Sequence, residues 1–341
     1  MTPAARAAVA EGMAMWANPS SPHAEGRAAR AAIERARAGI AASYGWTGET
    51  ILTSGASESL AIALGRSIVA RRVVSAVEHD ASFRAAPDAT TMGVGQDGLV
   101  DLAVLERSSQ GAIVAVQWAN SETGVRQPIA RIAEVVHAAG GLLLVDAAQM
   151  PAGCDDNVMA HADFVAVSAH KRGGPPGIGA LLVRDLATLA PSGGQERGYR
   201  SGTENLPAAL GYAAALAQPE DIDAMTRLRV RLDDSIVRSG GVVVAAEQAR
   251  HPAIGSYRLP GVAATTQLIR LDMAGFAVSA GSACSSGSMK PSHVLAAMGW
   301  SEAASREVIR VSFGRTTTER DVEAFIVAWR TMARAVRTFA A

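Results

Sequence analysis

The chain has 341 residues, of which 49% are hydrophobic and 19% charged, and its 32 Lys and Arg balance its 32 Asp and Glu. This composition is typical of a globular protein, and zero net charge without a long basic run argues against nucleic acid as a partner. The apolar runs, such as 141–145 and 241–246, are too short to span a membrane, and residues 1–11 lack the apolar core of a signal peptide.

Short strand-like runs alternate with Ala-rich helical stretches through the first two-thirds of the chain. The first run, Ile51–Thr53, leads into Gly55 and a helix from about Glu58. Further apolar runs of this kind follow at residues 72–76, 112–117, 142–145, 164–167 and 179–183. Because short apolar strands separated by helices form sheets that are covered on both faces, we predict an α/β fold with a mostly parallel sheet.

The pattern changes near Gln218 and Pro219. The elements predicted beyond this point are a helix over about 221–239, a strand at 242–244, a Gly/Ser-rich loop at 279–288, a strand over 308–312 and a helix from about 318. We therefore expect two domains. Residues 14–216 would form a large cofactor-binding domain, and residues 1–13 with 217–341 a smaller α+β domain that carries the Gly/Ser-rich loop.

Two charged residues stand near the ends of predicted buried strands. Asp146 follows the run 142–145, at the edge where open α/β sheets bind ligands, although an Asp there can equally cap the next helix. Lys171 follows Ser168-Ala169-His170 and precedes a Gly-rich turn. An acid can hold a pyridinium nitrogen protonated, and an amine can form an imine. The pair therefore predicts a site for pyridoxal phosphate (PLP).

A phosphate group also needs a cradle of donors. Residues 53–59 run from a strand into a helix start and would present N–H groups and hydroxyls to an anion, although any Ser-capped helix would look similar. The run 197–203, with Arg200 and Thr203, is a second candidate for completing it.

The two cysteines differ in their surroundings. Cys284 lies in the run 281–288, which otherwise contains only Gly, Ser and Ala, and this favours an accessible loop with a nucleophilic thiol. Cys154 lies in a turn, and we interpret it as structural. Two cysteines form no disulfide framework and suit a reducing compartment, so we expect a cytoplasmic protein.

Arg310 lies within the predicted strand 308–312. An arginine that projects from an apolar strand suits bidentate binding of a substrate carboxylate, and a salt bridge to another domain is the alternative. The histidines His161, His251 and His293 lack metal-ligand spacing, so no metal site is expected.

Taken in order, these segments resemble the cysteine desulfurases, group I, of the class V aminotransferase family of fold-type I PLP enzymes. The matching segments are 18–23, 53–59, 78–79, 120–124, 146–149, 168–171, 195–205, 279–295 and 309–315. The resemblance implies a mostly parallel, seven-stranded type of sheet in a large domain, a smaller α+β domain, PLP as cofactor and a homodimer.

The resemblance also implies a role for each matching residue. Lys171 would hold PLP as a Schiff base, Cys284 would attack the substrate sulfur, and His79 would stack on the cofactor ring and move protons. The residues expected to bind the cofactor are Ala56, Ser57, His79, Asn120, Asp146, Gln149, Ser168, His170, Lys171 and, from a second subunit, Thr203. Arg310 and Asn120 would bind the substrate.

The implied reaction converts L-cysteine to L-alanine and leaves a persulfide on Cys284. A sulfur-acceptor protein would then take the sulfur for Fe–S clusters, thiocofactors or tRNA thiolation.

Two departures from the family pattern leave alternatives open. The chain begins at Met1-Thr2-Pro3 where the family has a short strand and an Asp-x-Ala-Ala-Thr-Thr-Pro segment, so we expect either that the start is truncated or that the active-site edge is built differently. Ser121 stands where the family has a second Asn that bonds the phenolic oxygen of the cofactor. The alternatives are a class V aminotransferase or selenocysteine lyase-like PLP enzyme, and a weakly active, partner-dependent or non-catalytic homologue. Cys284 argues against the first, because those reactions need no protein nucleophile.

Overall fold

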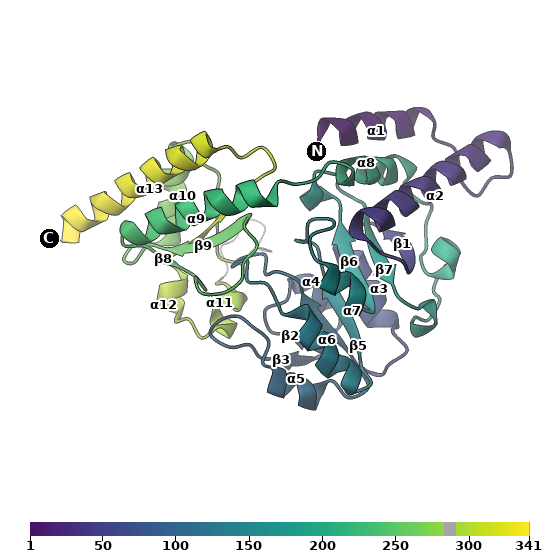
Figure 1. Ribbon diagram of the computed structural model, residues 1–341, viewed down its shortest axis with the longest axis horizontal. Helices are drawn as coiled ribbons and strands as arrows, with labels where there is room; N and C mark the ends of the chain where they lie inside the picture. The colour runs from purple at the N-terminus through teal and green to yellow at the C-terminus, as the bar shows by residue number, and fades with distance from the viewer. Residues whose placement is uncertain (283–290, 341) are drawn as a thin grey trace. The chain divides into compact units, whose positions relative to one another are not determined.

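Two sheets organise the residues that the computed structural model describes, 1–282 and 291–340 (Figure 1). Each sheet belongs to one of two compact units. The first unit comprises Met1–Met92, Leu102–Trp118 and Pro128–Pro219, and the second comprises Gly93–Asp101, Ala119–Gln127 and Glu220–Ala341.

The sheet of the first unit has seven strands. They are β1 (Glu49–Thr53), β2 (Arg71–Ser75), β3 (Thr90–Met92), β4 (Ala112–Gln117), β5 (Leu142–Asp146), β6 (Phe164–Ser168) and β7 (Gly179–Val183). Their order is β1-β7-β6-β5-β4-β2-β3, and of these strands only β7 runs antiparallel to its neighbours. Every residue of β4 and β6 is buried, because helices cover both faces. The predicted mostly parallel α/β sheet is confirmed.

Helices α1 to α8 complete this unit. They are α1 (Pro3–Ala14), α2 (Ala24–Tyr44), α3 (Ala56–Arg66), α4 (Asp80–Ala85), α5 (Leu102–Ser108), α6 (Ile129–Ala138), α7 (Asp156–His161) and α8 (Leu206–Leu216). Short 3-10 turns, η1 (His170–Arg172), η2 (Leu186–Thr188) and η3 (Glu196–Gly198), lie between the later elements. Helix α3 places Leu60, Ala63 and Leu64 on one face, and these pack into the core against β-strand residues such as Leu144 and Phe164. This packing fixes the start of α3 at the edge of the sheet.

The sequence analysis groups residues 1–13 with the second domain, but the structure places them in the first unit. Helix α1 instead packs against α8 within the first unit (Figure 1). The two helices approach closely through glycines: a Cβ on Gly12 would lie 2.6 Å from the Cα of Pro207, and one on Gly211 would lie 2.5 Å from Cγ2 of Val9. Small residues allow this close packing, and sequence periodicity alone does not reveal which partner a helix packs against.

The sheet of the second unit is antiparallel, in the order β10-β11-β9-β8. The elements of this unit are β8 (Val242–Val243), β9 (Ile254–Arg258), β10 (Ser279–Ala280), β11 (Val308–Ser312), α9 (Ile222–Arg238), α10 (Ala264–Met273), α11 (His293–Ala297), α12 (Glu302–Ser305) and α13 (Glu319–Ala340). The core contains Trp329, Leu232 and Ile309, and the ring of Trp329 meets that of Tyr257 edge to face at 6.3 Å.

A buried polar network ties α9 to this sheet. Arg229 of α9 is 4% exposed and donates to the carbonyls of Pro252 and Val311 and, at 2.5 Å, to the hydroxyl of Tyr257. Burial raises the pKa of Tyr257, and the phenol donates in turn to Asp233 at 2.6 Å. Without the guanidinium, these buried acceptors would therefore lack a hydrogen-bond donor.

Replacing Arg229 by Met should lower the free energy of unfolding of the second unit by about 3 kcal/mol or more, because three buried acceptors lose a charged donor. Arg231→Met is the matched control on the same helix. Arg231 pairs with Glu319 and Glu323 at the surface, where such a pair contributes at most about 1 kcal/mol. Urea unfolding with hydrogen exchange of the β9 and β11 amides measures both variants. Equal effects at the two positions would show that the Arg229 network contributes little.

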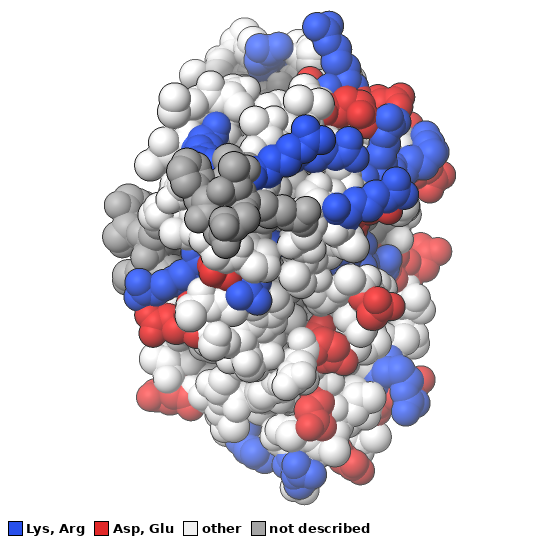
Figure 2. Space-filling view, turned by 90° about the vertical axis from the view of Figure 1, so that its left-hand side faces the viewer, with Lys and Arg blue, Asp and Glu red and all other residues white. Residues whose placement is uncertain are grey.

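Positive side chains gather on part of the surface although the net charge is zero. Lys and Arg side chains cluster on the upper part of the face in Figure 2. Three arginines of the second unit, Arg238, Arg330 and Arg334, line a pocket of about 300 Å³ between α9 and α13. Within the described residues, none of the helices is both long and apolar enough to cross a membrane.

Candidate active site

A pocket of about 300 Å³ lies in the first unit, beyond the carboxyl ends of β5 and β6. It brings together predicted cofactor residues that are far apart in the sequence: Ala56, Ser57, His79, Asp146, Ser168, His170 and Lys171. Gln149 and Thr203, which are also described, lie outside its lining. The volume is at the lower end of the range for small-ligand sites.

The start of α3 forms one wall of this pocket. Gly55 precedes the helix with a φ of +151°, a conformation that favours glycine, and no side chain caps the first turn. Strand β7 passes so closely that a Cβ on Gly179 would lie 2.6 Å from the Cα of Gly55. The uncapped N–H groups at the start of the helix, together with Ser57, form a cradle suited to an anion.

A carboxylate stands beside this cradle, and an arginine neutralises it. Glu58 accepts hydrogen bonds from the backbone N–H of Ser54 at 2.5 Å and from Arg200 at 2.9 Å. Burial acts to raise the pKa of Glu58, but these hydrogen bonds and the charge of Arg200 outweigh it and lower the pKa. The run 197–203 therefore reaches the cradle through Arg200.

Asp146 and Lys171 line the same pocket. Asp146 ends β5, is 7% exposed and accepts a hydrogen bond from the N–H of Ala148 at 3.0 Å. Lys171 lies in η1 directly after β6, and the turn that follows it uses Gly173 at a φ of +80°. The Gly173 carbonyl accepts a hydrogen bond from the N–H of Thr2 at 2.8 Å. The segment carrying Lys171 is thus held between β6 and the start of the chain.

Two histidines complete the pocket. Nδ1 of His170 lies 2.8 Å from the hydroxyl of Ser168, and burial together with the charges of Lys171 and Arg172 lowers the pKa of His170. His79 caps α4, because its Nδ1 accepts the N–H of Ala81 at 3.1 Å. A nitrogen that accepts a hydrogen bond carries no proton, so in this arrangement the ring proton of His79 is on Nε2.

The remaining predicted residues belong to the second unit. Oδ1 of Asn120 accepts hydrogen bonds from the N–H groups of Glu122 and Thr123, both at 2.8 Å, and from the Thr123 hydroxyl. Arg310, on β11, donates to the carbonyl of Ser121 at 2.8 Å and to the hydroxyl of Ser279 at 3.3 Å. Cys284 lies outside the described residues.

Comparison with known proteins shows the family of the chain. The family model for aminotransferase class-V matches residues 4–325. A cysteine desulfurase of Klebsiella pneumoniae is 36% identical over 92% of this chain and 84% of its own length, and an IscS-like cysteine desulfurase of Mycobacterium tuberculosis is 35% identical over 95% and 91%. The chain belongs to the cysteine desulfurases of the class V aminotransferase family.

A solved structure supports the same conclusion. The NifS-like protein of Rickettsia africae superposes with a TM-score of 0.88 at 30% identity, covering 97% of this chain and 96% of that one. The family resemblance inferred from the sequence motifs is therefore confirmed, and so is the fold-type I architecture. Enzymes of this family depend on PLP.

The pocket also shows which residues sequence reasoning missed. Leu60, Gly177 and Glu58 line it, and Glu58 pairs with Arg200. The sequence analysis includes Glu78 only within the matching segment 78–79 and assigns it no role, whereas the structure buries it completely beside this site. An acid directly between an apolar strand end and His79 was the available signal for Glu78.

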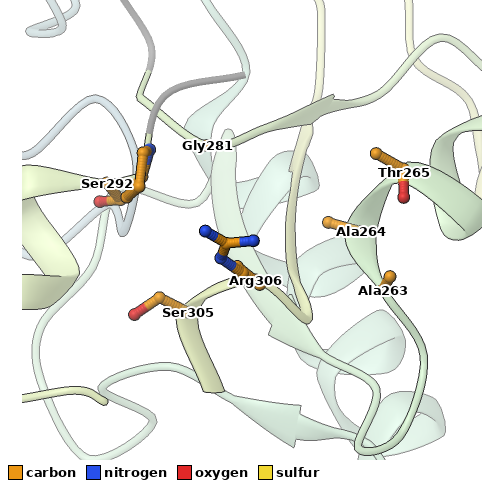
Figure 3. A pocket seen from close by; sticks show the side chains of 8 residues that line it. Ala263, Ala264, Thr265, Gly281, Ser292, Ser305 and Arg306 are labelled. Carbon is orange, nitrogen blue, oxygen red and sulfur yellow. The ribbon is translucent and has the colours of Figure 1, made fainter. Parts of the chain in front are cut away.

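A second pocket lies in the second unit (Figure 3). It measures about 200 Å³, and its lining includes the start of α10, Gly281, Ser292 and Arg306. None of the predicted site residues that the structure describes lines this pocket, so it does not enter the chemistry considered below.

Proposed function

We propose that this protein is a PLP-dependent cysteine desulfurase that converts L-cysteine to L-alanine and leaves the sulfur as a persulfide on Cys284. The observation that carries the proposal is the single pocket that holds an amine, a buried carboxylate and an anion cradle. The relatives from Klebsiella pneumoniae and Mycobacterium tuberculosis are named cysteine desulfurases, which supports this choice of reaction within the family.

The residues of the pocket fit PLP group by group. The cradle at Ala56 and Ser57, with Ser168 and His170 beside it, offers N–H and O–H donors for a phosphate. Lys171 offers the amine for the cofactor's carbonyl carbon, and Asp146 offers a carboxylate for its ring nitrogen. Lys171 and Lys290 are the only lysines of the sequence, which leaves few side-chain amines that could serve.

Bound PLP supplies an electron sink for the carbon skeleton of the substrate. Asp146 would hold the proton on the ring nitrogen and so keep that sink effective. Lys171, once its amine is free, would move the proton at the substrate Cα, with His79 as a second group that can hold a proton through its ring. Gln149 would bond the phenolic oxygen.

Residues of the second unit would handle the substrate. We propose that Arg310 binds the carboxylate of L-cysteine, because a guanidinium can bind both carboxylate oxygens at once. Asn120 would contribute through its amide nitrogen, since its Oδ1 already accepts three hydrogen bonds of the turn. Cys284 as a thiolate would attack the substrate sulfur, so that the carbon–sulfur bond breaks and a sulfur–sulfur bond forms.

The assembly and cellular setting are part of the same proposal. We propose a cytoplasmic homodimer in which Thr203 of one copy reaches the phosphate of the other. Thr203 is exposed and outside the lining of the pocket in its own chain, which suits a role toward a second copy. The persulfide would pass to a sulfur-acceptor protein, in line with the IscS-like naming of a relative.

The test is incubation of the protein with PLP and L-cysteine, with analysis of both products. Alanine in equal amount to the sulfur released by a reductant is the expected result. Pyruvate and ammonia in place of alanine would show β-elimination and would overturn the proposed reaction. A protein that binds PLP but leaves cysteine unchanged would favour a non-catalytic homologue.

Arg310→Ala should raise KM for L-cysteine by about 10- to 100-fold, because a charged hydrogen bond to the carboxylate contributes about 1.5–3 kcal/mol. Arg270→Ala, on the exposed side of α10, is the control and should leave KM unchanged. Steady-state kinetics over a range of cysteine concentrations measures both. Unchanged KM and kcat in Arg310→Ala would assign Arg310 to the structural contacts with Ser121 and Ser279 alone.

A further inference from the structure

A completely buried carboxyl group stands at the strand end next to the active-site pocket. Glu78, between the end of β2 and α4, has an exposed fraction of 0%. Its Oε1 accepts the backbone N–H of Gln117 at 2.7 Å, and the side chain of Gln117 donates back to the carbonyl of Val77 at 2.7 Å. These two hydrogen bonds join the end of β2 to the end of β4.

The same strand ends place Glu78 close to Asp146. Gln117, which binds Glu78, is the register partner of Asp146 across the parallel pair β4 and β5. Trp118 follows, and its N–H donates to the carbonyl of Asp146 at 2.9 Å. Two carboxyl groups are therefore carried by neighbouring strand ends of one sheet, one fully buried and the other lining the pocket that Lys171 also lines.

Burial disfavours the ionised form of Glu78, and a second carboxylate nearby disfavours it further. Burial and then the charge of Asp146 raise the pKa of Glu78 well above its usual range, and the hydrogen bond from Gln117 only partly opposes them. Four other groups near Glu78 and Asp146 can carry charge. His79 and Asp80 directly follow Glu78 in the sequence, and His170 and Lys171 lie on η1. Asp80 forms its own ion pair with Arg84 at the surface.

We propose that Glu78 is a positioning residue that keeps the proton of the Glu78–Asp146 pair, so that Asp146 alone carries the negative charge at the pocket. Since Oε1 accepts an N–H, the proton of Glu78 is on Oε2. The inference rests on the proposed function, because the ionised carboxylate of Asp146 would pair with the ring nitrogen of bound PLP.

Infrared spectroscopy of the full-length holoenzyme tests the protonation directly. At neutral pH the wild type should show the carbonyl stretch of a protonated carboxyl group, and Glu78→Gln should lose it. Glu58→Gln is the spectral control: Glu58 lines the same pocket, but its pKa is lowered, so that variant should keep the band. A wild type without the band, or a band that survives in Glu78→Gln, would overturn the proposal.

Turnover separates a positioning residue from a catalytic acid or base. Glutamine reproduces a neutral Glu78, with an oxygen to accept from Gln117 and N–H groups in place of the hydroxyl, so Glu78→Gln should keep kcat within about threefold. Glu78→Ala removes the acceptor of the Gln117 N–H and should lower kcat about tenfold or more. Rescue by Gln but not by Ala supports the proposal, and an inactive, correctly folded Glu78→Gln that binds PLP would contradict it.

The pH dependence of stability provides a readout that does not involve activity. Between the ordinary pKa of Glu and the raised one, the folded protein keeps a proton that the unfolded chain has lost, so stability falls as pH rises. The ratio of the unfolding constants of wild type and Glu78→Gln should therefore rise about tenfold per pH unit in that window. A ratio independent of pH would overturn the proposal.

If Glu78→Gln did not fold, titration of the infrared band in the wild type alone would still decide. If the enzyme failed to act on cysteine while the band was present, the proposed function would be wrong, but the proposed protonation of Glu78 would remain supported.

Discussion

Lys171→Ala should lose the visible absorbance of enzyme-bound PLP and should turn over L-cysteine at least about 100-fold more slowly. The physical reason is twofold. The variant lacks the amine that holds the cofactor covalently, and it lacks the base that would move the Cα proton, a contribution of about 100- to 10,000-fold in other enzymes. Absorbance spectra and initial rates of alanine formation measure the two effects separately.

The small number of lysines makes the control for this experiment decisive. The sequence contains only Lys171 and Lys290, so Lys290→Arg removes the other lysine and should keep the absorbance band. Borohydride reduction followed by peptide mapping of the wild type should place the cofactor on the peptide that contains Lys171. Cofactor on the Lys290 peptide, or a normal band in Lys171→Ala, would show that the lysine has been misassigned.

Cys284→Ser should keep the cofactor band and should form no protein persulfide, with sulfur transfer lowered at least about 100-fold. A serine hydroxyl is almost entirely protonated at neutral pH, whereas a thiol provides a useful fraction of thiolate. Persulfide labelling with a thiol-reactive reagent, followed by mass spectrometry, measures the outcome on the protein itself.

Cys154→Ser is the matched control, because Cys154 is the other cysteine of the sequence and is exposed. It should label and turn over like the wild type. Persulfide on Cys154, or normal sulfur transfer by Cys284→Ser, would show that Cys284 is not the nucleophile and would refute its proposed role.

Much of the fold was predictable because it is written in local patterns. The strands with buried apolar runs, β2, β4, β5, β6 and β7, were all expected within a residue or so of their bounds. Strand β3 was not expected, because it has three residues and two of them are exposed, which leaves no apolar run to detect. Periodicity reports burial, and a short exposed edge strand has little of it.

Long-range packing was harder to predict. The stretches 93–101 and 119–127 cluster with the second unit although they lie inside the first in sequence, and α1 clusters with the first unit. Bridges such as Val125 with Arg250 hold one of these stretches in place. No local pattern reports a partner more than a hundred residues away.

The candidate site shows the same division. The sequence pointed to Lys171, Asp146 and the phosphate cradle through their local motifs and to His79 through the family resemblance, and the structure places these residues around one pocket. The structure showed that Arg200 pairs with Glu58 beside the cradle, and that Oδ1 of Asn120 accepts hydrogen bonds within a turn.

The sequence by itself thus determined which reactive groups the chain offers: a lysine after a buried strand, an acid at a strand end, and a thiol in a run of small residues. Only the tertiary structure showed how the carboxyl groups are buried. Glu78 and Asp146 are both carboxylic acids and lie 68 positions apart, and the fold buries Glu78 completely near Asp146. Which of two acids keeps a proton depends on burial and on neighbouring charge, and both are properties of the folded chain.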